Sequence, residues 1–272
     1  SETMAKIFAY ITARNQPKTN NIILPVVGGL RRCGHSVEIR ESDEYPRGDE
    51  ENADILAVWG DYAGVDRILH DCGKKLWRML HIDNSYLRRG HYQGYYGISW
   101  NDRQCGSYLW DKDFPADRFR KLGEEIKPWK TSGSTVAVLG FSRKQGHVIG
   151  LNYLDWLAKT VKDVRQHTKC KVIARPKLYD GSDVRAFYRQ EDVHTVVGLF
   201  TKSMIMALLD GIPVFPLASC AASSMGLDDL KKIDSPWYPD NREDFFNRLA
   251  YHQWTLKELE QGKPWEHIWR FP

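Results

Sequence analysis

The sequence predicts an α/β fold with two domains, each built on a mostly parallel sheet. The first observation is that short apolar runs alternate with longer amphipathic stretches in strand–helix order, which is typical of parallel sheets covered by helices. The second is a stretch of Pro, Thr, Ser and Gly at 128–134, after which a new strand–helix series begins. We therefore predict domains at 1–130 and 131–272, with the last helices free to pack back on the first domain.

Four strands and two helices are predicted before residue 84. Short apolar runs indicate the strands, and apolar residues spaced three or four apart indicate the helices. Gly34 suits the end of the first helix, because glycine readily adopts the left-handed conformation found there. The strands are expected at 5–11, 35–39, 54–59 and 76–82, and the helices at about 20–33 and 65–72.

The second domain repeats this order after a segment that breaks it. Residues 84–110 are rich in Arg, Tyr and Gly and have no clear period. Residues 201–215 combine a hydroxyl-rich turn, a short apolar helix, a glycine stop and a buried strand. Further strands are expected at 98–100, 135–139, 171–174 and 195–199, and helices at 116–126, 152–167, 184–188, 243–254 and 256–261.

The composition indicates a cytoplasmic protein that does not enter a membrane. No apolar run reaches the roughly 18 residues that cross a bilayer. The five cysteines are scattered, without the spacing of a zinc site, which favours a reducing compartment. The net charge of +4 is too small to make the whole surface bind polyanions. The oligomeric state is left open.

Three strand ends in the second domain carry anion-binding chemistry. In open parallel sheets, ligands bind beyond the carboxyl ends of the strands. Each of these ends offers a cation beside a hydroxyl or a turn, which suits a diphosphate, although each alone also fits an ordinary solvated loop. The predicted donor-binding residues are Ser142, Arg143, Arg175, Lys177, Thr201, Lys202 and Ser203.

Several cofactor and metal signatures are absent from the sequence. There is no P-loop and no G-x-G-x-x-G after the first strand, which argues against phosphate hydrolysis and a dehydrogenase. The histidines show no H-x-x-x-H or H-E-x-x-H pairing. Asp111-Lys112-Asp113 is formally a D-x-D, but its setting favours a charged turn. We therefore predict no metal site and no tightly bound cofactor.

The strand ends at 140–143, 175–177 and 201–214 resemble those of GT-B glycosyltransferases. That family has two Rossmann-like domains facing a cleft, with the donor site in the C-terminal domain and the acceptor site in the N-terminal one. The resemblance implies that Lys177, Thr201, Lys202 and Ser203 hold the diphosphate of a UDP-sugar or other nucleotide-sugar. It covers the second half in pattern, whereas the first half matches only in its β/α rhythm, and the chain is short for that fold.

Further segments resemble phage-type glycosyltransferase-like proteins, some of which modify hydroxymethylated bases in viral DNA. These segments are 81–86, 95–102, 235–243 and 249–253. The resemblance implies that the basic, aromatic segment contacts a DNA acceptor, with Arg side chains on phosphates and Tyr side chains at an extruded base. An ordinary surface loop packed by its own tyrosines is the alternative. The implied acceptor-binding residues are Arg88, Arg89, His91, Tyr95, Tyr96 and Arg103.

An inverting transfer to a hydroxyl needs a general base that removes the acceptor's proton. Asp83 and Asp61 each follow an apolar strand of the first domain, so both are expected at the same sheet edge. Asp83 is the first candidate, because His81 and Asn84 can orient it. Helix capping or a turn bond is the alternative for each aspartate. A retaining reaction would need neither as a base.

The sequence thus predicts a hexosyl- or pentosyltransferase, with 5-hydroxymethylated pyrimidine in phage DNA as the expected acceptor. A sugar-nucleotide epimerase, or another GT-B-fold enzyme acting on a small molecule or glycan, is the alternative among enzymes. A non-catalytic protein that binds nucleotides or nucleic acid is the alternative outside them. The sugar, the base and the stereochemistry remain open.

Overall fold

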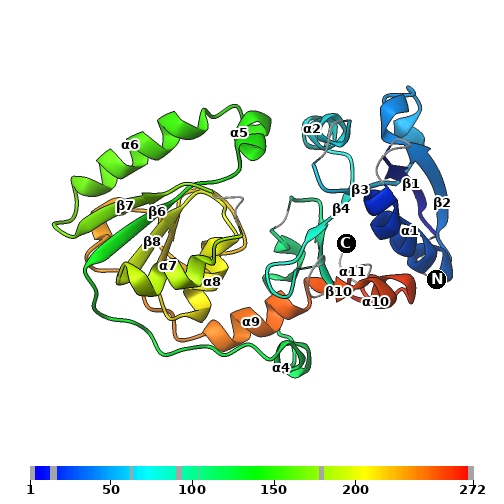
Figure 1. Cartoon of the computed structure of the whole chain (residues 1–272). Coiled ribbons are helices and arrows are strands. Elements are labelled where there is room, and N and C mark those ends of the chain that lie inside the picture. The colour runs from blue at the N-terminus through cyan, green and yellow to red at the C-terminus, as the bar shows by residue number, and fades with distance from the viewer. Residues whose placement is uncertain are drawn as a thin grey trace. The chain divides into compact units, whose positions relative to one another are not determined.

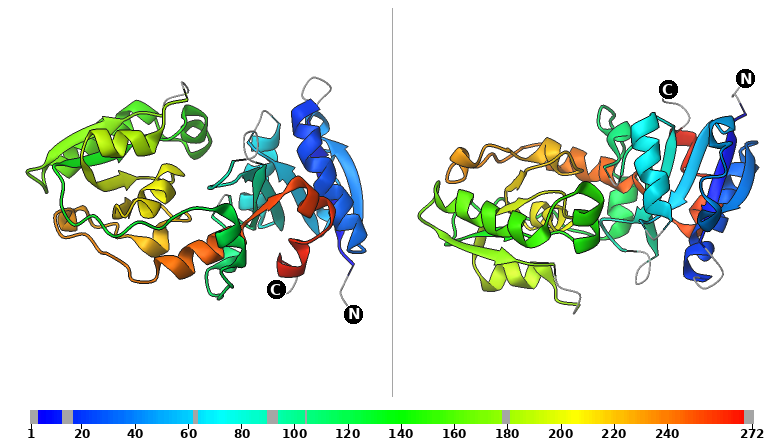
Figure 2. Two further views of the ribbon diagram at one scale, coloured as in Figure 1. Left: turned by 60° about the horizontal axis from the view of Figure 1, so that its bottom comes forward. Right: turned by 90° about the horizontal axis from the view of Figure 1, so that it is seen from above.

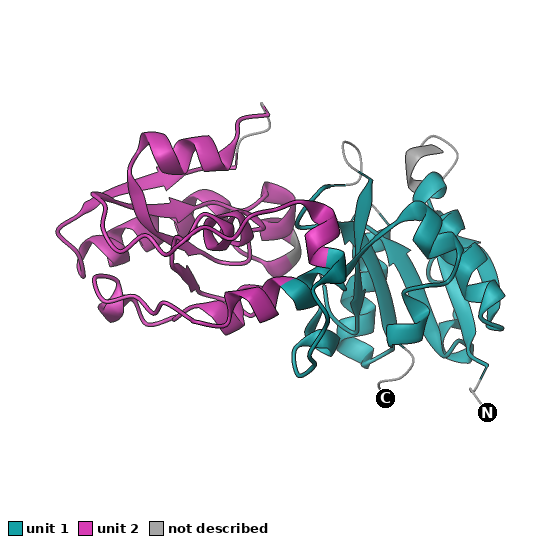
Figure 3. Cartoon of the chain, turned by 90° about the horizontal axis from the view of Figure 1, so that it is seen from below, with its two compact units in different colours: residues 1–118, 247–272 teal, residues 119–246 magenta. Residues whose placement is uncertain are grey.

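The computed structural model describes residues 4–12, 17–61, 64–89, 94–103, 105–177 and 181–268 (Figure 1). The chain folds into two compact units, shown in Figure 3. Unit 1 comprises 1–118 and 247–272, and unit 2 comprises 119–246. The last helices belong to the same unit as the N-terminal part of the chain, a placement that the sequence left open, and unit 2 begins at Phe119.

Unit 1 contains a six-stranded sheet in the order β10-β5-β4-β3-β1-β2. Strands β1 to β4 are parallel, whereas β5 runs antiparallel to β4, and β10 runs antiparallel to β5. The strands are β1 (Lys6–Ile11), β2 (Ser36–Glu41), β3 (Ile55–Trp59), β4 (Met79–Asn84), β5 (Tyr95–Trp100) and β10 (Gln253–Thr255).

Both faces of this sheet are covered, which explains why the central strands β1 and β3 are almost entirely apolar and buried. Alternate residues of β1 point to opposite faces, so Ile7 and Phe8 belong to different core clusters. The first cluster joins the sheet to α1 and the C-terminal segment, and the second joins it to α2. The helices are α1 (Pro17–Arg32), α2 (Val65–Lys75), α10 (Leu256–Glu260) and α11 (Trp265–Ile268).

Unit 2 contains a four-stranded, fully parallel sheet in the order β7-β6-β8-β9. Helix α6 packs on one face, and α7 and α8 pack on the other (Figures 1 and 2). The strands are β6 (Thr135–Leu139), β7 (Lys171–Arg175), β8 (Val193–Gly198) and β9 (Val214–Pro216). The helices are α5 (Arg143–Ile149), α6 (Tyr153–Arg165), α7 (Val184–Gln190) and α8 (Ser203–Leu209).

Two further helices, α4 (Asp117–Leu122) and α9 (Arg242–Ala250), lie where the chain passes between the units. The helix expected at 243–254 ends at Ala250, because Gln253 to Thr255 pair with β5 as β10. Local pattern had no means of indicating this, since the pairing strand is about 150 residues away in the chain. Helix α5 was also not expected.

The predicted α/β fold of two Rossmann-like units with mostly parallel sheets is confirmed. In unit 2, Gly211 shows how the motif at 201–215 fits this fold. Its φ is +74°, and a Cβ there would lie 1.9 Å from the carbonyl oxygen of Pro128. The segment leading into unit 2 therefore runs directly over this turn, with Lys130 N–H donating to the Gly211 carbonyl at 2.7 Å.

Candidate functional site

The two predicted base candidates of unit 1 lie at the carboxyl ends of neighbouring strands. Asp61 follows β3 by two residues, and Asp83 is the penultimate residue of β4. The strands are held in register there, since Gly60 N–H donates to the Ile82 carbonyl at 2.8 Å. The Asn84 N–H donates to an Asp83 carboxylate oxygen at 2.6 Å. Because β3 and β4 are parallel neighbours, both aspartates emerge at one edge of the sheet, as predicted, and both are half-buried.

His81 is buried beside these carboxylates. Its Nε2 lies 2.9 Å from the carbonyl oxygen of Gly60. Because a carbonyl can only accept, Nε2 carries the proton and Nδ1 is left as an acceptor. Burial lowers the pKa of His81, although the negative charge of Asp83 opposes this shift. The imidazole is therefore neutral at neutral pH.

Arg103 supplies the positive charge of this cluster. Burial lowers the pKa of its guanidinium, and the carboxylates of Asp61, Asp83 and Asp66 oppose that shift. Arg103 thus interacts electrostatically with both base candidates. The sequence had assigned Arg103 to DNA phosphates, and nothing in its local sequence indicated that it would also lie near carboxylates.

The other predicted acceptor residues have different surroundings. Arg89 is exposed and Arg88 is half-exposed, and the Arg88 carbonyl accepts from Tyr95 N–H at 3.0 Å. The Tyr96 ring is buried edge-on against Trp59, with centroids 5.4 Å apart, so it forms part of the core. Tyr95 is half-buried. His91 lies outside the described residues.

In unit 2, Ser142 and Arg143 begin α5 beyond the end of β6. Ser142 forms a capping box with Gln145: its Oγ accepts from Gln145 N–H at 3.1 Å, and the Gln145 side chain accepts from Ser142 N–H. This box fixes the direction of α5. Arg143 is exposed on its first turn.

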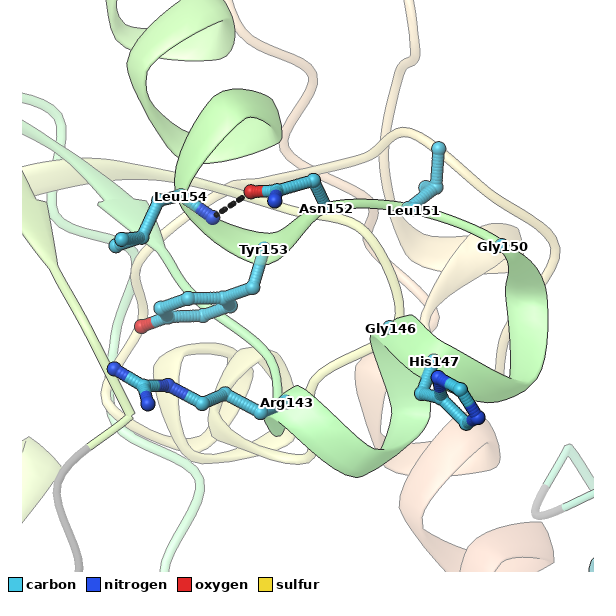
Figure 4. A pocket seen from close by; sticks show the side chains of 8 residues that line it. All are labelled: Arg143, Gly146, His147, Gly150, Leu151, Asn152, Tyr153 and Leu154. Carbon is cyan, nitrogen blue, oxygen red and sulfur yellow. Dashed lines mark hydrogen bonds between the residues drawn. The ribbon is translucent and has the colours of Figure 1, made fainter.

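Helix α5, the link that follows it and the start of α6 line an open pocket of about 540 Å³ (Figure 4). Arg143 points toward the ring of Tyr153. Gly140 allows Tyr153 to approach β6, since a Cβ there would lie 2.6 Å from the phenol oxygen. The lining residues are Arg143, Gly146, His147, Gly150, Leu151, Asn152, Tyr153 and Leu154.

Tyr153 also links this pocket to the next strand end. Its hydroxyl accepts from Lys177 N–H at 2.9 Å, and the Lys177 side chain is exposed. The Arg175 guanidinium donates to Ser182 Oγ at 3.1 Å and lies over the Phe187 ring, 5.3 Å from its centroid. The ends of β7 and β6 are adjacent, because Leu139 pairs with Arg175.

The Thr201–Ser203 turn follows β8, on the other side of β6 in the sheet. The hydroxyl groups of Thr201 and Ser203 are able to cap the helix that follows them. Instead, Lys202 is the N-cap residue and makes no side-chain capping bond, while Thr201 Oγ1 accepts from Ser203 N–H at 3.2 Å within the turn. The strand order β7-β6-β8 nevertheless places the three predicted donor loops side by side.

Sequence reasoning missed three features of these sites. The pocket depends on α5, whose capping-box pattern Ser142-x-x-Gln145 was the available signal. Tyr153 reaches β6 only because position 140 lacks a side chain. His252 joins the β4–β5 face from a segment that returns to unit 1 late in the chain, and no local pattern indicates such a return.

Among the residues that the structure describes, no three His, Cys, Asp or Glu side chains gather in a way that could hold a metal ion. In the same part of the chain, no helix has the length and apolar character that crossing a membrane requires. All five cysteines lie within the described ranges, and none of them forms a disulfide.

Comparison with known proteins gives similarity at the level of fold. No protein-family model and no curated protein matches the chain. Among solved structures, the KpsC β-Kdo 2,7-transferase of Thermosulfurimonas dismutans matches with a TM-score of 0.52 and 11% identity, over 95% of this chain and 98% of that one. The two chains share a fold.

Two weaker matches accompany it. The KpsC β-Kdo 2,4-transferase of the same organism has a TM-score of 0.48 at 11% identity, covering 90% of this chain and 91% of that one. A protein titled putative UDP-N-acetylglucosamine 2-epimerase, from Listeria monocytogenes, has a TM-score of 0.28 at 9% identity, covering 95% and 94%. We draw nothing from these two. The shared fold with a transferase agrees with the α/β architecture expected from the sequence.

Proposed function

We propose that this protein is a glycosyltransferase that moves a sugar from a nucleotide-sugar donor to a hydroxyl group of an acceptor. The observation that carries the proposal is the cluster at the end of β3 and β4, where Asp83 and Asp61 meet a neutral histidine and a cation. The fold shared along nearly its whole length with a β-Kdo transferase supports it. The three adjacent cationic loops of unit 2 also support it.

Unit 2 would bind the donor. Its exposed cations suit a diphosphate, because guanidinium and ammonium groups form charge-assisted hydrogen bonds with phosphate oxygens. Arg143 and Lys177 lie on the two strand ends that Tyr153 connects. Lys202, with the hydroxyls of Thr201 and Ser203, would complete the site on the β8 side. A UDP-sugar or other nucleotide-sugar is the co-substrate, and no resident cofactor is needed.

Unit 1 would supply the base. In the proposed step, an Asp83 oxygen takes the proton of the acceptor hydroxyl while the hydroxyl oxygen bonds to the anomeric carbon of the sugar. The bond from the anomeric carbon to the diphosphate breaks, and the nucleoside diphosphate leaves with the electron pair. The positive charge of Arg103 offsets the negative charge of the carboxylate cluster. Asp61 is the second candidate for the base.

For the acceptor, we propose a hydroxymethylated pyrimidine in phage DNA, acted on in the host cytoplasm. Arg88 and Arg89 support this, because they lie in the segment that follows β4 and Asp83, where Arg89 forms a bridge with Tyr95 at the start of β5. Arg103 and Tyr96 add less support than expected, since one interacts with carboxylates and the other is part of the core. If the protein does not modify DNA, a glycan or a small molecule is the alternative acceptor.

Activity is tested by mass spectrometry of hydroxymethylated DNA, oligosaccharides and small polyols incubated with the protein and a panel of nucleotide-sugars. For Asp83→Asn, we expect kcat to fall by about 10²- to 10⁴-fold, the usual contribution of a general base. Donor affinity, measured by calorimetry, should stay within about twofold, since the donor would bind to unit 2. Undiminished turnover in both Asp83→Asn and Asp61→Asn would contradict the assigned chemistry.

The corresponding variant in unit 2 is Arg143→Gln, which tests donor binding. Removing one charge-assisted hydrogen bond to phosphate should raise the donor KM by about tenfold or more and change kcat less. Hydrolysis or epimerisation of the donor without transfer would favour the epimerase alternative. Donor binding without any product would favour a non-catalytic nucleotide-binding protein.

Salt dependence tests the DNA acceptor. If Arg88 and Arg89 meet phosphates, log Kd for duplex DNA should change linearly with log salt, and Arg88→Gln with Arg89→Gln should reduce the slope by about two. Lys231→Gln with Lys232→Gln, which removes two lysines from unit 2, is the matched control and should leave the slope unchanged. Weak binding with no salt dependence would exclude DNA as the acceptor.

A further inference from the structure

Polar side chains gather on one face of unit 1's sheet, where the core is otherwise apolar. His81 and Asp83 are two residues apart on β4, so they point to the same face. In the antiparallel pair with β5, His81 lies opposite Ser99, and Asp83 lies opposite Gly97. Residues opposite each other share a face, with Cβ atoms about 4.5–5.5 Å apart. Position 97 therefore marks the place next to the Asp83 side chain.

The imidazole of His252 occupies that place. A Cβ added to Gly97 would lie 2.6 Å from His252 Cε1, and one added to Gly106 would lie 2.5 Å from His252 Cδ2. The lack of side chains at these two glycines therefore leaves the space that the His252 ring fills. His252 is 3% exposed, and its ring lies 5.4 Å from the Tyr86 ring, centroid to centroid. It arrives from the segment that returns to unit 1 just before β10.

His252 also reaches the neighbour of His81. Its Nε2 lies 3.0 Å from Ser99 Oγ, and Ser99 is directly opposite His81. The His81 side chain is 1% exposed, and its Nδ1 has no hydrogen-bond partner within the described part of the chain. The face thus holds two buried imidazoles and a buried hydroxyl around one carboxylate.

Burying these groups costs free energy that apolar side chains would not. A leucine at 252 would fill similar volume without a polar atom, and alanines at 97 and 106 would fill much of the space themselves. Because the sequence instead combines a histidine with two glycines drawn from distant segments, the packing alone does not account for the imidazole.

We propose that His252 is a positioning residue for Asp83. Its ring fixes the orientation of the Asp83 carboxylate from the adjacent position. Its hydrogen bond with Ser99 Oγ also holds Ser99 in place opposite His81. His252 itself takes no proton in this step, because the proton passes from the acceptor hydroxyl to Asp83. This inference rests on the proposed function.

The test compares His252→Leu with His252→Gln in the full chain. Loss of orientation should lower kcat of His252→Leu by about 10- to 100-fold, the effect of displacing a reacting group by about 1 Å, with an unchanged donor KM. His252→Gln keeps a polar end that can reach Ser99, so it should recover most of the lost kcat. Ser99→Ala should give an intermediate loss.

His267→Gln is the matched control. It removes an imidazole from the same C-terminal segment, but one that stacks on Trp254, with centroids 5.6 Å apart, in the opposite core cluster. We expect kcat to be unchanged. If His252→Leu does not fold, Gly97→Ala provides the second variant, because its methyl group displaces the ring without removing it, and it should lower kcat in the same way.

A second readout does not depend on turnover. The carboxyl carbon resonance of Asp83, assigned by its absence in Asp83→Asn, should shift in His252→Leu and Gly97→Ala but not in His267→Gln. An unshifted resonance, or a failure of glutamine to restore kcat, would overturn the positioning role. If the resonance shifts as expected but Asp83→Asn keeps full activity, the placement of His252 beside Asp83 stands and the proposed base is wrong.

Discussion

The strand ends of unit 1 and unit 2 belong to similar parallel arrangements, but their charged groups differ in burial and in what they interact with. In unit 1, the polar groups are buried or half-buried and interact with one another: His81 is buried and neutral, and the half-buried Arg103 interacts with two aspartates. In unit 2, Arg143 and Lys177 are exposed beside an open pocket. Buried and mutually oriented groups suit proton transfer, whereas exposed cations suit the capture of an anionic ligand.

The two regions also differ in how the chain assembles them. The unit 2 site consists of joints between a strand and the next helix, so each part is local in sequence. The unit 1 cluster combines β4 and β5 with His252, which is about 150 residues further along the chain. Unit 1 chemistry should therefore depend on the docking of the C-terminal segment, and unit 2 binding should not.

Gly29→Ala should have the largest effect on stability, because it breaks that docking. A Cβ at Gly29 would lie 1.8 Å from the Leu259 carbonyl oxygen, where α1 packs against α10. We expect unit 1 to lose about 2–3 kcal/mol through this overpacking, measured as loss of hydrogen-exchange protection in α1 and β10.

Gly28→Ala is the neighbouring control. The nearest atom to its added Cβ, on the Glu260 side chain, lies at an ordinary 3.6 Å. Alanine is favoured over glycine inside a helix, so this variant should be unchanged or more stable by about 0.5–1 kcal/mol. Equal effects of the two variants would contradict close packing of α10 on Gly29.

Mild acid should weaken unit 1 through His81. Burial lowers the pKa of this histidine in the folded state, so its contribution is fully present above the unfolded pKa of about 6.5 and is lost as the pH falls through that value toward the folded one. Protection of β4 against hydrogen exchange, corrected for intrinsic rates, should therefore fall between about pH 7.5 and 5.5.

In unit 2, burial also lowers the pKa of His194, but that side chain is only half-buried. We therefore expect a smaller change in β8 over the same pH range. His81→Gln, which can still donate to the Gly60 carbonyl, should reduce the pH dependence of β4. An unchanged dependence in this variant would show that another group is responsible.

The smallest effect compares two capping boxes, Ser142 with Gln145 on α5 and Thr255 with Glu258 on α10. Either Ser142→Ala or Thr255→Ala should cost about 1 kcal/mol in its own unit. Only Ser142→Ala should also raise the donor KM, because α5 carries Arg143. A raised donor KM in Thr255→Ala would contradict the separation of roles between the units.

Much of the fold was predictable because its signals are local. The strands β1, β3 and β6 are short apolar runs bounded by turn residues, and their expected and observed limits differ by at most one residue. The emergence of Asp61 and Asp83 at the same sheet edge followed from the expectation of parallel strands alone. The start of β5 and the existence of β10 did not follow, because pairing between distant segments forms them.

The residues that surround Asp83 were only partly predictable. His81 was expected there, since it lies two residues away on the same strand. Arg103 looked like one more cation of a basic loop, and its electrostatic environment became apparent only with the carboxylates around it. His252 looked like part of a terminal helix, and the glycines at 97 and 106 gave no sign of what they accommodate.

The sequence by itself determined the α/β class, the order of strands and helices along each half of the chain and the residue types that stand at each strand end. These depend on hydrophobic period, turn residues and the fixed geometry of parallel strands, all of which act over a few residues. Only the tertiary structure decided which groups are buried together and which remain exposed. Burial depends on contacts between distant segments. It distinguishes the neutral His81 of unit 1 from the solvent-exposed cations of unit 2.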